Sequence, residues 1–265
     1  RSRLSVCLES GPHQVVRRSR AASDIGRSAD AHPPPLTLRM SLKGCTLTYF
    51  KIAGRAEPIR LALTIGGIEF TDDRIAGDKW GELKPTTPWG QVPVLTLADG
   101  TKLAQGATLL RFVGKQTSLY PDDPLAAARV DEIMDVMNDM SEALRTTGQG
   151  MEPPARDAAR KEACSPGGRI YEWLKKVEAF ISANGSDGHA VGNAMTIADI
   201  KVFASMSSLV SGVFDGVPLD TLNAFPKIQA LRKMVASHPA VVAYYDARGD
   251  AVADAEKAYR DARNL

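Results

Sequence analysis

Cysteine is scarce in this chain of 265 residues, and long apolar runs are missing. Cys7, Cys45 and Cys164 lie far apart and form neither a CxxC pair nor a Cys/His metal motif. The sequence therefore excludes a disulfide-stapled scaffold and a zinc module with the usual ligand spacing. No apolar run approaches the ~20 residues that a membrane-spanning helix needs. We expect no membrane partner, no required metal, and a location in a reducing compartment, the cytoplasm.

Clustered positive charge is also missing from the body of the protein. The 33 basic and 31 acidic side chains give the chain a net charge of +2. Seven arginines against three acids give residues 1–39 a charge of +4, which leaves −2 for the rest. A near-neutral body without a stripe of Lys and Arg offers no surface for a phosphate backbone. We therefore expect no nucleic-acid partner.

Residues 1–43 show no hydrophobic periodicity, and we predict a disordered N-terminal extension. Their Arg-rich and Ser-rich composition is typical of an organelle transit peptide, but they lack an initiating Met and contain acids. Translated upstream sequence ahead of a start at Met40 explains them as well. We give an organelle signal less weight than a cytoplasmic location, and N-terminal sequencing of the native protein decides whether residues 1–39 belong to it.

Residues 44–120 alternate between strand and helix patterns. A βαβ unit gives a parallel strand pair, and the turn at Asp99 and Gly100 adds an antiparallel hairpin. The product is a small mixed sheet with helices packed on it, which is the thioredoxin-like βαβ–ββα arrangement. The predicted elements are strands at 45–50, 68–74, 92–97 and 101–104, helices at 55–66 and 106–116, and a loop at 76–90.

Residues 124–248 carry only helical periodicity, so the fold class is α/β plus all-α, with a helical bundle after the thioredoxin-like domain. The turn-rich joint from Tyr120 to Pro124 marks the boundary. Thr196 and Asp199 form a capping-box start for a helix that we place at the buried centre of the bundle. Helices are predicted at 127–144, 168–183, 197–211, 226–236 and 239–247, with a break at 148–154 and a polar tail, helical or frayed, at 249–265.

Three local features could serve a small-molecule site, and each also has an ordinary structural interpretation. Tyr49 lies at the end of the first strand, where it faces the start of a helix. Its hydroxyl can donate a hydrogen bond to a thiolate. On these residues alone, however, a tyrosine that packs in the core is the better interpretation. A cis Val92–Pro93 bond would expose a strand edge, although a trans proline at a loop end is commoner. Gln105 and Gly106 begin a helix whose free N–H groups could bind a carboxylate. The alternative is an ordinary helix start that binds no ligand.

Several motifs in a fixed order resemble the cytosolic glutathione transferases. They are LTYF and GRAEPIR within 47–60, a loop with Trp80 and Lys84, QVPVL at 91–95, AQ-x-x-x-LLRF at 104–112, VDEIMDVMND at 130–139 and TIAD at 196–199. The resemblance is closest to the sigma class, which includes haematopoietic prostaglandin D synthases and invertebrate and protist enzymes. It covers about residues 44–248 and implies glutathione as co-substrate and a homodimer.

The resemblance also implies a role for single residues. Tyr49 matches the catalytic tyrosine whose hydrogen bond stabilises the glutathione thiolate for attack on small apolar electrophiles, and Arg55 matches the arginine that packs beside it. The glutathione-binding positions that it implies are Tyr49 at the sulfur, Trp80 and Lys84 at the glycyl carboxylate, Gln91, Val92 and Pro93 at the cysteinyl moiety, Gln105 and Gly106 at the γ-glutamyl carboxylate, and Asp139 at the γ-glutamyl amine of the partner subunit's glutathione.

Two positions depart from the family pattern. Gly106 stands where the family has Ser, so the backbone N–H remains but a hydroxyl donor is lost. A neutral hydrogen bond contributes roughly 0.5–1.5 kcal/mol, which predicts glutathione binding weaker by up to about tenfold. Asn138 replaces an acid of a cluster that binds a divalent ion in some sigma enzymes, so a metal effect is not expected.

The predicted function is that of a glutathione transferase, and two alternatives stay open. One is a glutathione-dependent isomerase of the prostaglandin D synthase kind. The other is a non-catalytic structural or ligand-binding protein, as the related lens crystallins are. The chain retains the residues that match the thiol site of the family, which argues against this second alternative. The residues at 52–54 and 140–150 and the C-terminal tail, which would surround the electrophile, match the family poorly. The sequence therefore does not choose among conjugation, isomerisation and peroxidase activity, and it does not identify the electrophile.

Overall fold

The computed structural model of the chain describes residues 42–248 and 254–265. The disorder predicted for residues 1–43 falls, except for the last two residues, outside this part of the chain. The first five residues of the predicted tail, 249–253, fall outside it as well.

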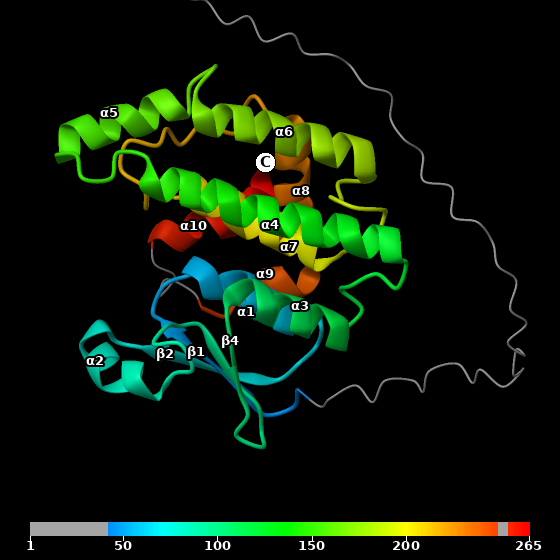
Figure 1. The fold of residues 1–265 in the computed structure, drawn as a ribbon. Helices are drawn as coiled ribbons and strands as arrows, with labels where there is room; N and C mark the ends of the chain where they lie inside the picture. The colour runs from blue at the N-terminus through cyan, green and yellow to red at the C-terminus, as the bar shows by residue number, and fades with distance from the viewer. Residues whose placement is uncertain (1–41, 249–253) are drawn as a thin grey trace, which may run out of the picture. The chain divides into compact units, whose positions relative to one another are not determined.

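The N-terminal half of the described chain is built on a four-stranded mixed sheet with the order β2-β1-β3-β4 (Figure 1). β1 pairs with β2 in parallel and with β3 antiparallel, and β3 pairs with β4 antiparallel. The βαβ–ββα arrangement predicted from the sequence is confirmed. The elements are β1 (Cys45–Phe50), α1 (Glu57–Ile65), β2 (Phe70–Ile75), α2 (Trp80–Leu83), β3 (Val94–Thr96), β4 (Lys102–Ala104) and α3 (Gly106–Gln116), with a 3-10 turn η1 (Gly54–Ala56) ahead of α1.

β2 is an edge strand whose charged side chains are all engaged. Thr48 donates its hydroxyl proton to Asp73 at 2.9 Å, while Asp72 accepts from Arg74 at 2.6 Å and from Arg60 of α1 at 2.9 Å. Charged residues on an edge discourage pairing with another chain. The strand begins two residues later than its hydrophobic pattern predicted, because the residues before it close the turn that ends α1.

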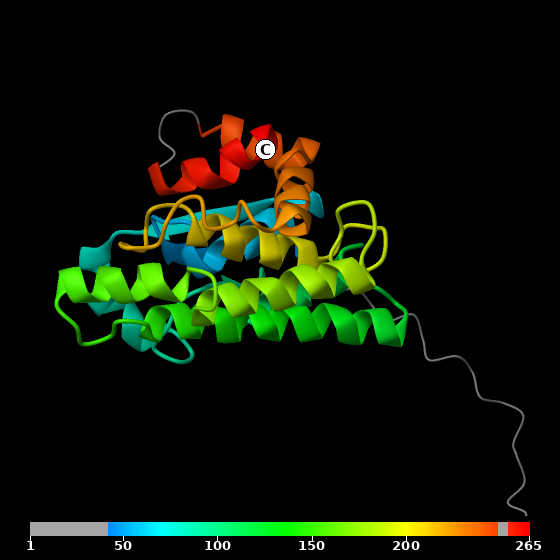
Figure 2. The same cartoon turned by 90° about the horizontal axis from the view of Figure 1, so that it is seen from above.

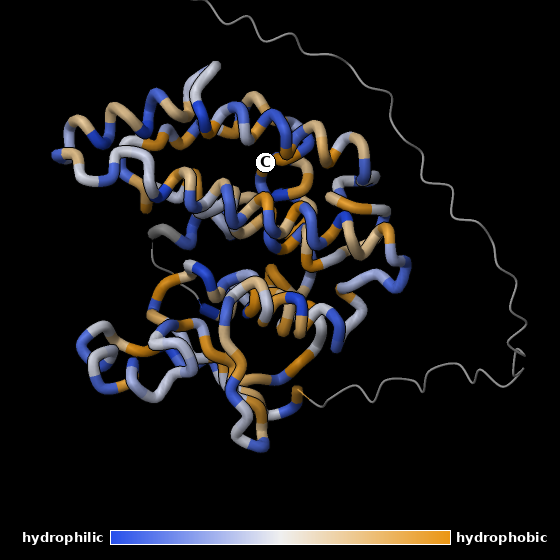
Figure 3. The backbone as a smooth tube through the Cα atoms, in the orientation of Figure 1, coloured by the Kyte–Doolittle hydropathy of each residue, from blue (hydrophilic) through white to orange (hydrophobic). Residues whose placement is uncertain are grey.

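The second half of the described chain is helical, as predicted (Figure 1). α4 and α6 run side by side in both views of the fold (Figures 1 and 2). In Figure 3 these long helices alternate between hydrophilic and hydrophobic residues, as amphipathic helices do. The helices are α4 (Pro124–Thr146), α5 (Pro153–Ala163), α6 (Arg169–Asn184), α7 (Ile197–Leu209), α8 (Pro226–Ala236), α9 (Pro239–Asp246) and α10 (Asp254–Arg260).

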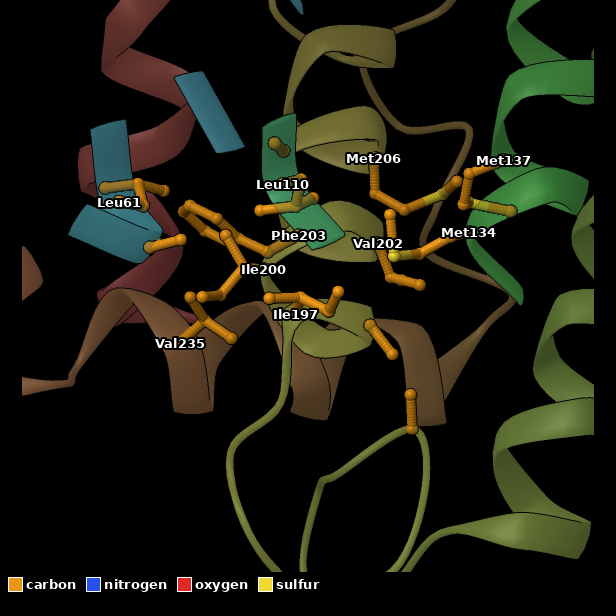
Figure 4. Packing of buried hydrophobic residues seen from close by; sticks show 14 of the residues in the cluster. Leu61, Leu110, Met134, Met137, Ile197, Ile200, Val202, Phe203, Met206 and Val235 are labelled. Carbon is orange, nitrogen blue, oxygen red and sulfur yellow. The ribbon is translucent and has the colours of Figure 1, made fainter. Parts of the chain in front are cut away.

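α7 lies at the centre of the hydrophobic core, as its sequence predicted. Figure 4 shows its side chains reaching neighbours on several sides: Met206 and Val202 point toward α4, and Phe203 toward Leu110 of α3. Its start is the predicted capping box. The side chain of Thr196 accepts from the N–H of Ala198 at 3.3 Å, and the N–H of Thr196 donates to the carboxylate of Asp199 at 2.7 Å.

Helix α5 was missed, and the break predicted at 148–154 overlaps its first two residues. The sequence interpretation took Pro153 and Pro154 as breakers, but they occupy the first turn of α5. Proline is tolerated there, since the N–H groups of the first turn have no intrahelical partner. The glycines at 148 and 150 do end α4, and both have positive φ angles.

Two further contacts had no signal in the local sequence pattern. The acids of α4 were interpreted as a solvated face, yet Asp131 and Asp135 both accept hydrogen bonds from Arg111 of α3, at 2.6 and 2.7 Å. They tie the helical half to the thioredoxin-like half. In the predicted tail, Tyr259 of α10 is only 2% exposed and packs edge-on against Phe203 of α7.

Candidate active site

A cleft runs between the sheet half and the helical half, and it consists of two adjoining cavities. The Gln105 cavity, about 330 Å³, is lined by η1 and the start of α3 on one side and by α4 on the other. The Tyr49 cavity, about 300 Å³, lies between β1, α4 and α7. Both cavities are lined by Arg55, Pro58, Ser141, Arg145 and Lys201.

Tyr49 lies at the end of β1, where its hydroxyl faces the turn η1. The backbone N–H of Arg55 donates a hydrogen bond to the Tyr49 Oη at 3.2 Å. Since this oxygen is thereby used as an acceptor, the hydroxyl proton remains available for donation into the cavity. Gly54 makes this contact possible: its φ is +48°, and a Cβ there would lie 2.7 Å from the Tyr49 oxygen.

The loop between Tyr49 and Arg55 is held by Arg60, which sequence reasoning missed. Arg60 is fully buried in α1, and its guanidinium donates to the carbonyl oxygens of Ile52 at 2.9 Å and Ala53 at 3.2 Å. It also pairs with the buried Glu57 at 3.0 Å. Burial acts to lower the pKa of Arg60, but the negative charges of Glu57 and Asp72 outweigh it and raise that pKa.

Glu57 connects the same loop to the helical half. Its second carboxylate oxygen accepts from Tyr245 of α9 at 2.9 Å, so both oxygens are used. Burial raises the pKa of Tyr245 well above its usual range, and the charge of Glu57 adds to the effect. A buried network with every member bonded is rigid. It fixes the turn that carries the amide of Arg55 to Tyr49.

The start of α3 combines a strained residue with free helical N–H groups. Gln105, the residue before the helix, has a φ of +74° although it is not glycine, and such strain tends to cluster at functional sites. Its side-chain amide donates to Gln91 at 3.2 Å, which joins two predicted glutathione positions. Gly106 lies beside Pro93, and the Val92–Pro93 bond is cis.

The remaining predicted residues lie outside the two cavities. Trp80 begins α2 and packs edge-on against Phe50, the residue after Tyr49, at 5.5 Å between ring centres. Lys84 follows α2 and is exposed beside Gly90. Asp139 lies on an exposed part of α4 and does not line either cavity of its own chain.

The helical wall of the Tyr49 cavity is partly apolar and partly polar. Met140, Leu144, Leu209 and Phe214 form the apolar part. One face of α7 adds Lys201, Ser205 and Ser208, which recur at the i, i+4, i+7 spacing of a single helix face. This helix was predicted at the buried centre of the helical half, and its polar face was missed.

Lys201 is the most perturbed titratable group in the cleft. Burial and the nearby positive charge of Arg55 lower its pKa to about 8, and Asp135 only partly offsets them. Perturbed titratable groups in clefts are candidates for functional roles. Within residues 42–248 and 254–265, no group of three or more His, Cys, Asp or Glu side chains could hold a metal ion. None of the helices in this part of the chain is long and apolar enough to cross a membrane.

Known proteins match this chain over most of its described length. Residues 138–248 match the family model "Glutathione S-transferase, C-terminal domain". Glutathione S-transferase 1 of Ascaris suum is 36% identical over 172 residues, which are 64% of this chain and 82% of the relative. Hematopoietic prostaglandin D synthase of Gallus gallus is 28% identical over 202 residues, 76% of this chain and 95% of the relative.

A solved structure of rat hPGDS in complex with a quinoline superposes with a TM-score of 0.67 at 26% identity. It covers 78% of this chain and 98% of that one. The resemblance stated from the motifs is confirmed by these matches, which extend through both halves of the fold. The chain belongs to the glutathione S-transferase family and is a glutathione transferase.

Proposed function

We propose that the cleft binds glutathione and that Tyr49 stabilises its thiolate for attack on an electrophile held in the Tyr49 cavity. The observation that carries this proposal is the hydrogen bond from the Arg55 amide to Tyr49 Oη. That bond fixes the phenol and leaves its proton to donate to a sulfur. The apolar wall formed by Met140, Leu144 and Phe214 suits the apolar part of an electrophile.

One hydrogen bond is strong enough to stabilise the glutathione thiolate to the extent that the reaction requires. A free thiol has a pKa of about 8.5, so only a few per cent is thiolate at neutral pH. A hydrogen bond to a charged acceptor contributes roughly 1.5–3 kcal/mol, which lowers the thiol pKa by about one to two units. Thiolate then becomes a major species without a separate general base.

With an aryl halide as substrate, the reaction is a substitution in which sulfur replaces the halide. The thiol gives its proton to solvent, the sulfur forms a bond with the ring carbon, and the carbon–halogen bond breaks with the halide taking the electron pair. Tyr49 donates to the sulfur throughout and is not consumed. Arg55 lines both cavities, so its positive charge favours the thiolate form and opposes its reprotonation.

The glutathione backbone would extend from Tyr49 along two sets of residues. The start of α3 at Gln105 and Gly106 offers N–H groups to the γ-glutamyl carboxylate. The backbone of Val92, next to Pro93, would pair with the cysteinyl part, and Gln91 would support this segment through its hydrogen bond with Gln105. Trp80 and Lys84 would hold the glycyl carboxylate. These residues follow β2, precede β3 and follow β4 at the edge of the sheet where Tyr49 ends β1, and this order supports the assignment. We infer in addition a sigma-class enzyme of the cytoplasm, on the similarity to hematopoietic prostaglandin D synthase.

We infer a homodimer in which Asp139 contacts the γ-glutamyl amine of the partner subunit's glutathione. The exposure of Asp139 and its absence from the cavities of its own chain support this inference. Light scattering should give the mass of two chains, and Asp139→Asn should raise the KM for glutathione. A monomer with normal glutathione affinity would contradict it.

The main test is the conjugation of glutathione to a generic aryl halide by Tyr49→Phe. We expect kcat near neutral pH to fall by about 10- to 100-fold, since the donated hydrogen bond is worth roughly 1.5–3 kcal/mol, while KM for glutathione changes little. Tyr171→Phe is the matched control, because Tyr171 packs on Phe225 outside both cavities. Near-normal conjugation by Tyr49→Phe would move thiol activation to another group, with Arg55 the first candidate.

A glutathione-dependent isomerase is the second candidate function, and the similarity to hematopoietic prostaglandin D synthase favours it. It would use the same thiolate at Tyr49. An assay with an aryl halide, an organic peroxide and a prostaglandin endoperoxide separates the three reactions. Turnover of the endoperoxide alone would replace conjugation as the main activity.

A further inference from the structure

Two cations that line the cleft make no hydrogen bond or ion pair through their charged groups to any described residue. Within residues 42–248 and 254–265, no hydrogen bond or ion pair holds the Nζ of Lys201 or the guanidinium of Arg55. The third cation of the cleft differs, because Arg145 donates to both carboxylate oxygens of Glu142. Among the described residues, no carboxylate contacts either of these two positive charges directly, although Asp135 and Glu142 act on them through space.

The two free cations come from opposite walls. Arg55 lies on η1 beside Tyr49, and Lys201 lies on α7, yet both line both cavities. Each acts on the other through space, which is why Arg55 contributes to the low pKa of Lys201. The nearest acids do not neutralise them: Asp135 is paired with Arg111, and Glu142 with Arg145. An anion placed between the walls would pair with both cations at once.

The surroundings of Lys201 indicate which molecule would bring that anion. Its own helix adds the hydroxyl of Ser205 beside the apolar wall of the Tyr49 cavity. Ser141 and Ser208 line the same cavity, but the Ser141 hydroxyl donates to the Met137 carbonyl at 2.7 Å and the Ser208 hydroxyl bonds to Tyr259. Cations and hydroxyls suit a carboxylate or sulfonate. The neighbouring apolar side chains suit a ring or an alkyl chain.

We propose that Lys201 and Arg55 form an anion subsite in the Tyr49 cavity, so that this enzyme prefers electrophiles that join an apolar body to a carboxylate or sulfonate group. This inference rests on the proposed function, of which it specifies the substrate class. The acid group lies at Lys201 and the reacting carbon at the thiolate beside Tyr49. Glutathione itself is the competing occupant, because Lys201 also lines the cavity of Gln105, where the γ-glutamyl carboxylate would bind.

The first experiment compares a chloronitrobenzoate with the matching chloronitrobenzamide as substrates. In both substrates the thiolate sulfur displaces chloride from the ring. The kcat/KM of the acid is divided by that of the amide in the wild type and in Lys201→Met, and comparing the two ratios cancels the intrinsic reactivities of the substrates. We expect the wild-type preference for the acid to fall by about tenfold or more in Lys201→Met, as loss of one charged contact predicts. Lys201→Arg, which keeps the charge, should retain most of the preference.

The second experiment measures binding without turnover. Calorimetry with unreactive nitrobenzoate and nitrobenzamide is done on the wild type and the two variants, each with and without saturating S-methylglutathione. Tighter binding of nitrobenzoate that depends on a charge at position 201 and survives S-methylglutathione supports the subsite. Thermal unfolding of each variant shows whether it is folded.

Three results would overturn the proposal. They are a wild type without preference for the acid, a preference that persists in folded Lys201→Met, and nitrobenzoate binding that S-methylglutathione abolishes. The last result would assign the two cations to glutathione. If no variant conjugates either substrate but nitrobenzoate binding still depends on Lys201, the subsite stands and the proposed transferase chemistry fails, so the two failures are distinguishable.

Discussion

Arg60 and Lys201 are both basic side chains on helices that border the cleft, but their surroundings are opposite. Arg60 makes hydrogen bonds or ion pairs with Glu57, Asp72 and two backbone carbonyls, and its pKa is raised. Lys201 makes none with the described residues, and its pKa is lowered to about 8. A buried charge with every donor used holds the structure in place. A largely buried charge without a partner costs stability and is explained best by a ligand that the protein binds.

The largest expected effect is on the Arg60 side of this comparison. Arg60→Met leaves the buried carboxylate of Glu57 without its cation, and breaking such a pair costs about 3–5 kcal/mol. Urea unfolding should show this loss in the free energy of unfolding. Lys201→Met is the matched control, and it should cost little or even stabilise the fold, because it removes an uncompensated charge. Equal losses in the two variants would erase the distinction between the two cations.

The pH dependence of stability should separate the wild type from Lys201→Met. The folded state releases the Lys201 proton at a pH of about 8, whereas an unfolded lysine keeps it up to about 10.4. The unfolded state therefore holds more protons between these values, and the free energy of unfolding rises with pH across that window. We expect the wild type to gain on the order of 2 kcal/mol relative to Lys201→Met between pH 7 and pH 10.

The groups that face Lys201 are Arg55 on η1 and Asp135, Glu142 and Arg145 on α4. All of these groups are present in both proteins, so the difference between the two proteins isolates Lys201. Parallel stability curves for the wild type and Lys201→Met would show that Lys201 is in contact with water and is not the unpaired charge described above.

A smaller effect is expected at Gly106, the predicted glutathione-binding residue that departs from the family pattern. Gly106→Ser should lower the KM for glutathione by up to about tenfold, since one neutral hydrogen bond is restored. The backbone has room for the change: a Cβ at Gly106 would lie 3.5 Å from the carbonyl oxygen of Arg55 and 3.9 Å from Pro93. Gly106→Ala is the control, because it adds the Cβ without the hydroxyl. An unchanged KM in Gly106→Ser would refute the hydroxyl account.

The smallest effect concerns strain at the start of α3. Gln105→Gly removes a side chain from a residue with a φ of +74°, and we expect the fold to gain up to about 1 kcal/mol. Glutathione affinity should fall, because the hydrogen bond to Gln91 is lost. Gln105→Asn keeps an amide in a conformation that Asn tolerates and should lie between the two. A variant that is both more stable and as tight for glutathione would show that the strain has no function.

The sequence predicted the fold well wherever local signals agree with the packing. The strand at 45–50, the helix at 106–116 and the capping box at Thr196 are found as predicted. α5 was missed because proline has opposite meanings inside a helix and in its first turn. The start of β2 was misplaced because its apolar pattern continues into the preceding turn.

The candidate site was predicted only in part, and for a physical reason. Tyr49, Gln105 and Gly106 lie in local motifs, whereas the roles of Arg60 and Lys201 depend on what surrounds them in space. Arg60 in GRAEPIR has the pattern of a surface arginine, and only the fold brings Asp72 and two carbonyls to it. Lys201 had one usable signal: with Ser205 and Ser208 it forms a polar stripe on an otherwise apolar helix.

The most direct test of the account is the ionisation of glutathione bound to the enzyme. Ultraviolet absorbance of the thiolate, followed as a function of pH, gives the pKa of the bound thiol in the wild type and in Tyr49→Phe. The account predicts a thiol pKa about one to two units below that of free glutathione in the wild type, and most of this shift lost in Tyr49→Phe. Equal thiol pKa values in the two proteins would contradict it, because Tyr49 would then not be the group that stabilises the thiolate.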